Sequence, residues 1–259
     1  MKNNKSLKYI LTGVLLSIVL ATPTMAQKNK FEHKIVAGYN FGATAPVPVP
    51  SEVRTIKAYW PEFTPQLGYN VTYHYSPNWG VTSGILLDYK GMGVQDRVKY
   101  MYTSVILEAD NNRPLTGYFV GRNQTRINIA YATVPIYLTY SPNETWNFKV
   151  GGYISYRFSS EFKGKVWDGY LRVENTEIGG PTGEKITITK EDKATFNFGD
   201  DMRDFDFGLS IGSERRINDK FGIYGNLSWG LTSIFPNDYK TVDFKMYNIY
   251  LSLGLTYKL

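Results

Sequence analysis

The stretch Asn248–Leu259 reads N-I-Y-L-S-L-G-L-T-Y-K-L and alternates between two kinds of side chain. Its odd-numbered positions, from Ile249 to Leu259, are apolar, whereas the even-numbered ones are mostly polar or small. Such a period of two is typical of a β-strand with one apolar and one polar face. A tilted strand of this length also matches the thickness of a lipid bilayer. The pattern favours a membrane-spanning strand, and a strand of a soluble sandwich is the alternative.

The composition narrows the class of protein. The 259 residues include 21 Tyr, 14 Phe and 24 Gly, an abundance that β-rich membrane proteins share. No cysteine is present, which excludes disulfides and thiolate metal sites. The mean hydropathy is −0.30, and no apolar run of helix length follows the N-terminal one, so a helical membrane protein is excluded. A barrel remains open because half of each barrel strand is polar.

Residues 1–26 have the three parts of a secretory signal peptide. Three lysines form a basic segment, Ile10–Ala21 is apolar, and Thr24-Met25-Ala26 ends on a small residue where a signal peptidase could cut. The apolar run is too short to span a membrane as a helix. We therefore expect Sec-dependent export, removal of residues 1–26, and a single outer-membrane β-barrel domain over residues 27–259.

The charge of the exported part is nearly balanced. The signal peptide carries three lysines and no acid, so 26 basic residues remain against 23 acidic ones, a net charge of +3. The isoelectric point near 9.2 therefore overstates how basic the protein is. No nucleic-acid partner is predicted.

Eight segments with period-two alternation follow the signal peptide. They are His33–Ala43, Leu67–Tyr75, Val81–Lys90, Thr125–Tyr140, Trp146–Phe158, Asp204–Glu214, Phe221–Leu231 and the closing stretch Asn248–Leu259. The connections between them alternate between long and short, starting and ending with a long one. Short periplasmic turns and long extracellular loops give this order. The sequence thus predicts an all-β fold, an eight-stranded antiparallel up-and-down transmembrane β-barrel.

Three connections carry more detailed expectations. The proline-rich stretch Ala43–Gln66 cannot pair inside a sheet and is predicted to be a loop. The segment Gly91–Asn123 is predicted to be a second long connection, strand-like only around Val98–Leu107. Between Ser159 and Arg203, the glycine-rich residues 179–183 predict a protruding hairpin. Within the fourth strand, the apolar positions change parity beside Pro135, which predicts a β-bulge.

One face of the predicted strands carries no charge. It consists of Ile35, Phe41, Leu67, Val71, Ile85, Leu87, Phe148, Ile154, Phe207, Leu209, Ile223, Leu227, Ile249, Leu251 and Leu253. Aromatic residues gather beside the short turns, where rings at headgroup depth would form a girdle, namely Tyr75, Trp79, Tyr140, Trp146, Phe221 and Tyr257. In the alternative sandwich, the same apolar residues would form an internal core.

The opposite face is ionic. It carries four bases and four acids: Lys34, Arg126, Lys149, Arg157, Asp88, Asp204, Asp206 and Glu214. An eight-stranded barrel has an interior just wide enough for side chains. Because an unpaired buried charge costs several kcal/mol, these residues are predicted to form a salt-bridged plug in the lumen. Which acid pairs with which base stays open.

Val134–Tyr140, the segment from Asp204 to Gly212, and Gly230–Ile234 are three short motifs on the predicted strands. They resemble motifs of PorT-like outer-membrane β-barrels of Bacteroidota. Val134–Tyr140 resembles the family's I-P-L-x-x-K-Y strand, with Thr139 in place of Lys. The segment from Asp204 to Gly212 is similar to its F-D-x-G-L-x-x-G strand, and Gly230–Ile234 to its Y-G-L-x-N-I strand end. A terminal Phe or Tyr, part of the usual barrel-assembly signal, is replaced by Leu259. The resemblance implies an outer-membrane barrel, and an accessory role in protein secretion for a few members.

The sequence shows little sign of catalysis. His33 and His74 are the only histidines, and both lie at the predicted periplasmic end. They cannot make a zinc site without carboxylate help, so no metal or cofactor is predicted. An oxygen-rich Ca²⁺ site is a weaker alternative for five acids near the end of the third long loop. These acids are Glu191, Asp192, Asp200, Asp201 and Asp204.

The partners predicted are outer-membrane lipids, lipopolysaccharide, the barrel-assembly machinery during insertion and an unidentified surface ligand. Lys99, Arg113 and Arg122 could contact lipopolysaccharide phosphates from the second long loop. The first interpretation is a non-enzymatic barrel with surface loops and a plugged lumen. The alternatives are a narrow channel for ions or small solutes, a lipid-modifying enzyme, and an accessory component of secretion.

Overall fold

The computed structural model describes residues 30–107, 114–175, 178, 180–242 and 244–259. Residues Phe31–Leu259 form one compact unit. The expected signal peptide, and Arg113 among the predicted contact residues, lie outside the described residues. Of the residues that are described, none belongs to a helix long and apolar enough to cross a membrane.

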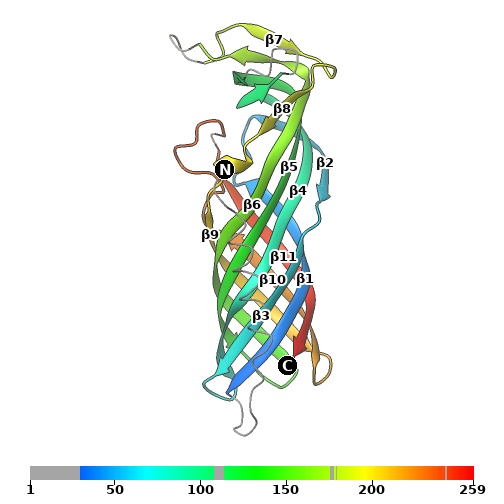
Figure 1. Ribbon diagram of the computed structural model, residues 1–259, viewed down its shortest axis with the longest axis vertical. Helices are drawn as coiled ribbons and strands as arrows, with labels where there is room; N and C mark the ends of the chain where they lie inside the picture. The colour runs from blue at the N-terminus through cyan, green and yellow to red at the C-terminus, as the bar shows by residue number, and fades with distance from the viewer. Residues whose placement is uncertain (1–29, 108–113, 176–177, 179, 243) are drawn as a thin grey trace, which may run out of the picture. The chain divides into compact units, whose positions relative to one another are not determined.

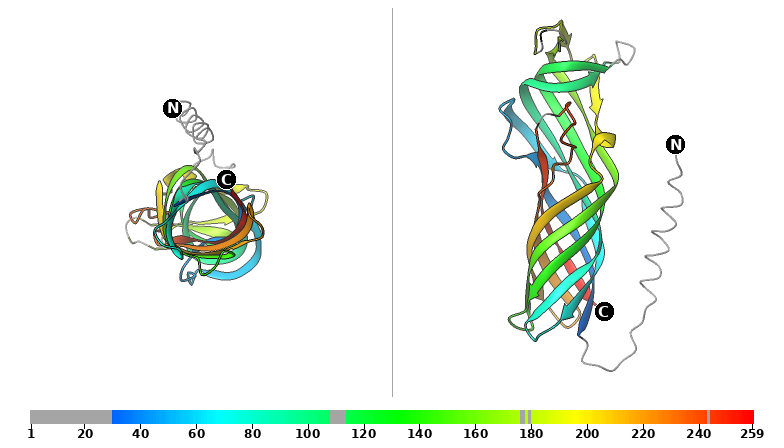
Figure 2. Two further views of the ribbon diagram at one scale, coloured as in Figure 1. Left: turned by 90° about the horizontal axis from the view of Figure 1, so that it is seen from below. Right: turned by 90° about the vertical axis from the view of Figure 1, so that its left-hand side faces the viewer.

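Eight antiparallel strands close into a ring (Figures 1 and 2), and the predicted fold class is confirmed. Each strand pairs with the next, β4 pairs with β5, and β11 returns to β1 with Lys34 opposite Lys258 and Pro46 opposite Met246. In order, the ring contains β1 (Phe31–Pro46), β3 (Pro65–His74), β4 (Trp79–Ile106), β5 (Pro114–Tyr140), β6 (Trp146–Val173), β9 (Phe205–Arg216), β10 (Phe221–Gly230) and β11 (Met246–Lys258).

Three neighbouring strands continue far beyond the ring. Strands β4, β5 and β6 have 28, 27 and 28 residues, whereas β9 and β10 have 12 and 10. We call their continuation, with the segments packed on it, the extension (Figure 1). The prediction that residues 91–123 form a long loop is therefore wrong, as is much of the loop predicted from Ser159 to Arg203. Alternation persists there, but with apolar side chains inward and charged ones outward.

Short strands complete the extension. Strand β2 (Val53–Pro61) lies in the proline-rich stretch predicted to be a loop, and it pairs along β4 as an edge strand with two register irregularities. Its proline stands at the last position, where a missing donor is tolerated. Strand β7 (Lys185–Ile188) pairs with the end of β6, which confirms the predicted hairpin. Strand β8 (Ala194–Asn197) pairs with β6 and touches β4 at Ile106, and the turn η2 (Gly199–Asp201) follows.

Strand β5 shows why the parity of apolar residues changes near Pro135. Its odd-numbered residues are buried from Gly121 to Thr139 without a phase slip. The register with β4 is continuous from Trp79 opposite Tyr140 to Lys99 opposite Val120, so the predicted bulge at Pro135 is wrong. The apolar residues change face because the surroundings change: Ile127 and Ile129 face a protein core, whereas Ile136 faces outward.

The ring and the extension have opposite polarity. Around the ring, the predicted apolar face points outward, with Leu209 58% and Leu227 47% exposed, while the interior is polar. In the extension, buried apolar side chains form a core around Phe119, Phe162, Leu171, Phe196 and Phe235. An interior of this kind is typical of water-soluble β-structure, whereas an uncharged outer belt around a polar interior is what a lipid environment requires.

Candidate functional site

The interior of the ring holds two groups of ion-paired side chains. The first lies toward the short turns and is centred on Glu214, which is 3% exposed. Lys34 Nζ lies 2.6 Å from Glu214 Oε1, and Lys149 Nζ lies 2.9 Å from Oε2. The Thr256 hydroxyl donates a third hydrogen bond to Oε1 at 3.1 Å. Strands β1, β6, β9 and β11 thus meet at one carboxylate.

A second carboxylate extends this group to the end of the ring. Glu32 forms ion pairs with Lys34 at 2.6 Å, with Lys258 at 3.1 Å and with Arg216 at 3.3 Å. Two acids are therefore surrounded by four bases in this group, counting Lys149. The bases that are most exposed, Arg216 and Lys258, face the end of the ring.

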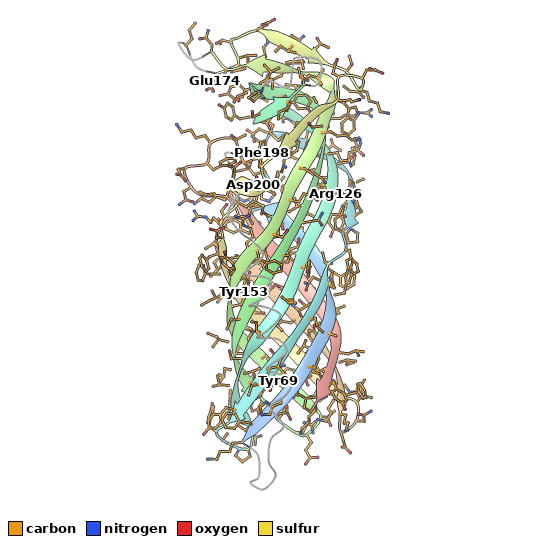
Figure 3. All side chains as sticks on the ribbon, in the orientation of Figure 1. Tyr69, Arg126, Tyr153, Glu174, Phe198 and Asp200 are labelled. Atoms are coloured by element: carbon orange, nitrogen blue, oxygen red, sulfur yellow. The ribbon has the colours of Figure 1, made fainter. Side chains whose placement is uncertain are left out.

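The second group is centred on Lys90, whose side chain is 2% exposed. Its Nζ lies 3.7 Å from Asp88 Oδ2 and 3.7 Å from Asp206 Oδ2. Three tyrosine rings surround the same ammonium, with centroids at 4.7 Å (Tyr153), 5.2 Å (Tyr131) and 5.9 Å (Tyr250). Figure 3 shows Tyr153 within the ring. Cation–π attraction strengthens in such dehydrated surroundings.

Neutral donors complete the coordination of the two aspartates. Asn40 and Gln66 donate to Asp88 Oδ1 at 2.7 and 2.9 Å. Asp206 accepts hydrogen bonds from three further side chains: Thr232 and Asn248 at 2.9 Å each, and Tyr153 at 3.1 Å. Buried carboxylates with this many donors satisfy the requirement that buried charge be paired and hydrogen-bonded.

A small polar cavity of about 40 Å³ lies between the two groups. Asp88, Lys90 and Lys149 line it, together with Asn70 and Tyr137. Asn70 Oδ1 has no hydrogen-bond partner among the described residues. The cavity has room for a few water molecules, which need about 10–15 Å³ each by this measure, and not for a solute.

Three of the residues predicted for the lumen lie elsewhere. Arg126 is on the outer face of β5, where it pairs with Glu62 at 2.8 Å and is 46% exposed (Figure 3). Arg157 and Asp204 pair with each other at 2.7 Å at the rim, where the side chain of Asp204 is 62% exposed. The lumen prediction for Arg126 is wrong because the inward parity of β5 does not change at Pro135, so even-numbered residues face outward along this part of the strand.

Two interior charges, Lys90 and Glu32, were not predicted. Lys90 has the parity of Asp88 on β4, and Glu32 has the parity of Lys34 on β1. Both could have been found by extending the inward parity to the ends of the predicted strands. Both residues lay at or beyond the limit of a predicted segment.

Arg157 acts as a clamp at the rim. Its guanidinium donates hydrogen bonds to the backbone oxygens of Met202 at 2.8 Å and Arg203 at 3.0 Å, and it contacts Ser160. It therefore ties β6 to the segment that joins η2 to β9. This contact positions one side of the extension over the ring.

Among the described residues of the extension, one acid is buried on the inner face. Asp96 is 8% exposed and lies opposite Asn123 in the β4–β5 register. Neither its Oδ1 nor Oδ1 of Asn123 has a hydrogen-bond partner among the described residues. Burial raises the pKa of Asp96 from 3.8 to about 6, and a hydrogen bond with the Asn123 side chain, which lowers the pKa, only partly offsets this effect.

Near the tip, a hydrogen bond to Glu174 raises the pKa of Tyr102 to about 12.

The residues predicted to contact lipopolysaccharide lie on the outer face of the extension where they are described. Arg122 pairs with Asp168 at 3.5 Å, both side chains being about half exposed. Lys99 lies over the Tyr100 ring, 5.4 Å from its centroid. The two bases face outward from neighbouring strands.

The histidines and the loop acids singled out in the sequence make local contacts where they are described. His33 Nδ1 lies 2.5 Å from the Tyr69 hydroxyl, and His74 ends β3. Asp192 accepts hydrogen bonds from Thr189, which lower its pKa, and Asp201 accepts one from Tyr239. Within the described ranges, no three His, Asp or Glu side chains are placed to hold a metal ion.

Comparison with known proteins gives one family and several solved structures. The family described as outer membrane protein beta-barrel domain matches residues 25–236. The chain is similar to Ail of Yersinia pestis (10% identity, 88% of this chain and 97% of that one, TM-score 0.31). It is also similar to CarO2 of Acinetobacter baumannii (7%, 88% and 99%, 0.40) and the outer membrane protease OmpT of Escherichia coli (11%, 92% and 99%, 0.33). No curated protein matches the chain in sequence.

Proposed function

Because the chain belongs to the outer membrane protein beta-barrel domain family, we propose that it is a non-enzymatic barrel with a plugged lumen and a surface-binding extension. The observation that carries this proposal is the interior ion-pair network. Lys34, Lys90, Asp88, Asp206 and Glu214 are all at most 5% exposed and belong to three strands of the ring, β1, β4 and β9. Such a network crosses the lumen instead of lining a pore.

Two features support closure. Moving an ion past Lys90 requires separating it from Asp88 and Asp206, which leaves buried charges unpaired at a cost of several kcal/mol. Above this level, the core of the extension packs around Phe162, whose ring centroid is 5.1 Å from that of Phe235. The polar plug in the ring is thus followed by the apolar core of the extension, and both would block a path through the interior.

Recording in planar lipid bilayers tests closure directly. We expect the purified protein to show no steady single-channel conductance, and the Lys90→Met variant to conduct or to insert poorly. Steady conductance of the wild-type protein, changed by Lys149→Met, would favour the narrow channel for ions or small solutes. The polar cavity beside Lys149 is the observation in favour of that second candidate.

The non-enzymatic proposal has its own test, because related barrels include a protease. A lipid-modifying enzyme would change lipid A, so its mass spectrum in a deletion strain should match that of the parent strain. A changed spectrum restored by the gene would contradict the proposal.

The proposal also covers the bacterial origin of the protein, its route of export and its binding partners. The PorT-like motifs support a Bacteroidota outer-membrane protein, and residues 1–26 support Sec export. The same likeness is the basis for the alternative role as a secretion accessory. Lys99 and Arg122, with Arg113, are proposed to contact lipopolysaccharide, and the barrel-assembly machinery is proposed to insert the protein.

A further inference from the structure

The outer face of the extension brings like charges directly opposite each other. Arg126 on β5 is paired in register with Lys163 on β6, and Arg122 on β5 with Arg97 on β4. All four are exposed on the same side of the sheet. Like charges at opposed positions of an antiparallel pair are destabilising. Two such pairs on one face therefore point to a bound anion.

A groove lies beside the first of these pairs. Its lining includes three bases and three neutral polar side chains, beside Ile106, Gly164 and Phe196: Arg126, Lys163, Lys165, Gln124, Thr195 and Asn197. We call it the basic groove. Two rows of paired residues form its floor, because Lys163 is opposite both Arg126 and Asn197, and Lys165 is opposite both Gln124 and Thr195. Its volume of about 440 Å³ exceeds that of a single phosphate and lies within the usual range of small-molecule sites, so it suits a phosphorylated sugar.

The local carboxylates leave this face with an excess of positive charge. Arg126 pairs with Glu62, Lys163 with Glu161, and Arg122 with Asp168. Arg97, Lys99 and Lys165 form no ion pair with any described residue. Lys165 instead lies over the Trp167 ring, 5.6 Å from its centroid. Six bases thus face three acids.

The height of the groove identifies the anion. Tyr89 and Phe158, with ring centroids 6.4 Å apart, mark the upper edge of the outer apolar belt. Tyr89 is opposite Ala130, and Arg126 follows four residues further along β5. At about 3.3 Å per residue, this places Arg126 roughly 13 Å along a tilted strand beyond the belt. A strand tilted by about 45° raises Arg126 roughly 9 Å above the belt, whereas headgroup regions extend about 5–8 Å beyond the hydrocarbon on each side. The groove therefore begins just outside the headgroup layer, where the phosphorylated sugars of a lipid would project.

We propose that the basic groove binds phosphate groups of lipopolysaccharide in the outer leaflet. This inference rests on the proposed placement of the extension at the cell surface. The phosphate oxygens accept charge-assisted hydrogen bonds from Arg126, Lys163 and Lys165, while Gln124, Thr195 and Asn197 are available to sugar hydroxyls. The bound phosphate relieves the repulsion between Arg126 and Lys163.

Binding of three probes to the full mature protein tests the proposal: phosphorylated lipopolysaccharide, the same material after dephosphorylation, and inorganic phosphate. The variant is Lys163→Gln with Lys165→Gln. The matched control is Lys185→Gln with Lys190→Gln, which removes two exposed lysines from another part of the extension. We expect the groove variant to bind phosphorylated lipopolysaccharide about tenfold or more weakly, and the control to bind it as the wild type does.

Each other outcome contradicts the proposal. Equal binding by the groove variant and the wild type excludes the groove, and undiminished binding of dephosphorylated material excludes phosphate recognition. Inorganic phosphate that competes at concentrations equal to those of lipopolysaccharide assigns the groove to a free anion. If the double variant fails to fold, Lys165→Gln alone removes a base that has no ion pair to lose. Conductance of the wild-type barrel would overturn the plugged lumen and leave this measurement unaffected.

Discussion

Lys90 lies buried between two carboxylates and three aromatic rings. Replacing it with methionine keeps the length of the side chain but leaves Asp88 and Asp206 as buried like charges. We expect Lys90→Met to lower the free energy of unfolding by about 3–5 kcal/mol, the usual loss when one partner of a buried pair is removed. Urea unfolding in lipid vesicles measures it. Lys240→Met, at an exposed loop position, should change the free energy of unfolding by less than about 0.5 kcal/mol. Equal losses in Lys90→Met and Lys240→Met would contradict a stabilising ion-pair network around Lys90.

We expect Asp96 to make the stability of the extension depend on pH. Its folded pKa of about 6 lies above the ordinary 3.8, so the folded state holds the proton more tightly. The stability that the neutral acid provides is full below about pH 4 and is lost as the pH rises through 6.

The corresponding substitution is Asp96→Asn, which keeps a neutral donor at every pH. We expect the variant to exceed the wild type by about 2–3 kcal/mol at pH 8, where a shift of this size has its full effect. The two proteins should become equally stable near pH 4. Urea unfolding of both proteins at the two pH values provides the measurement. A difference that is independent of pH would show that titration of Asp96 is not its cause.

At the scale of elements, β4, β5 and β6 each pass through two environments. Phe162 belongs to the upper part, where it is 5% exposed and contacts the rings of Phe196, Phe198 and Phe235. We expect Phe162→Ala to cost the extension about 3–5 kcal/mol, while the ring below stays folded. Trypsin should then cut the extension, and the unheated protein should keep its characteristic gel mobility.

The control for this prediction is Ile178→Ala, since Ile178 is 77% exposed near the tip. It should leave protease sensitivity unchanged. Loss of the barrel's gel mobility in Phe162→Ala would show that ring and extension unfold as one unit.

The apolar belt of the ring allows a matched comparison with the extension. Leu227 on β10 is 47% exposed and Ile56 on β2 is 58% exposed, so exposure alone does not separate them. We expect Leu227→Arg to cost about 2–4 kcal/mol in vesicles, because charge then faces lipid, and Ile56→Arg to cost almost nothing. Similar losses at both sites, measured by urea unfolding, would contradict a lipid-facing belt.

For the whole molecule, the family indicates the outer membrane as the location. The N-terminus of the mature protein tests how the chain is exported. We expect the protein isolated from outer membranes to begin at Gln27, because residues 1–26 carry the features of a cleaved signal. Edman sequencing or mass spectrometry of the intact protein provides the measurement. A retained Met1 would show that these residues serve as an anchor.

The eight ring strands could be predicted from the sequence because a period of two recurs in each of them. The connections between them also alternate between long loops and short turns. The inward positions of Lys34, Asp88, Lys149, Asp206 and Glu214 followed from the same parity. Their ion-pair partners did not, because partners lie on strands far apart in the chain and depend on the register around the ring. Lys34 and Glu214, for example, are 180 positions apart.

The sequence by itself thus determined the eight ring strands and the apolar and polar sides of each, whereas only the tertiary structure decided which medium each side meets and how far β4, β5 and β6 continue. Alternation specifies that one side of a strand is apolar, but it is the same whether that side touches lipid or a protein core. On β5, Ile129 and Ile136 look alike in sequence, yet one is 1% exposed in a core and the other 52% exposed on the belt. Where the belt ends and the extension begins is set by the neighbours that β2, β7 and β8 bring onto the long strands.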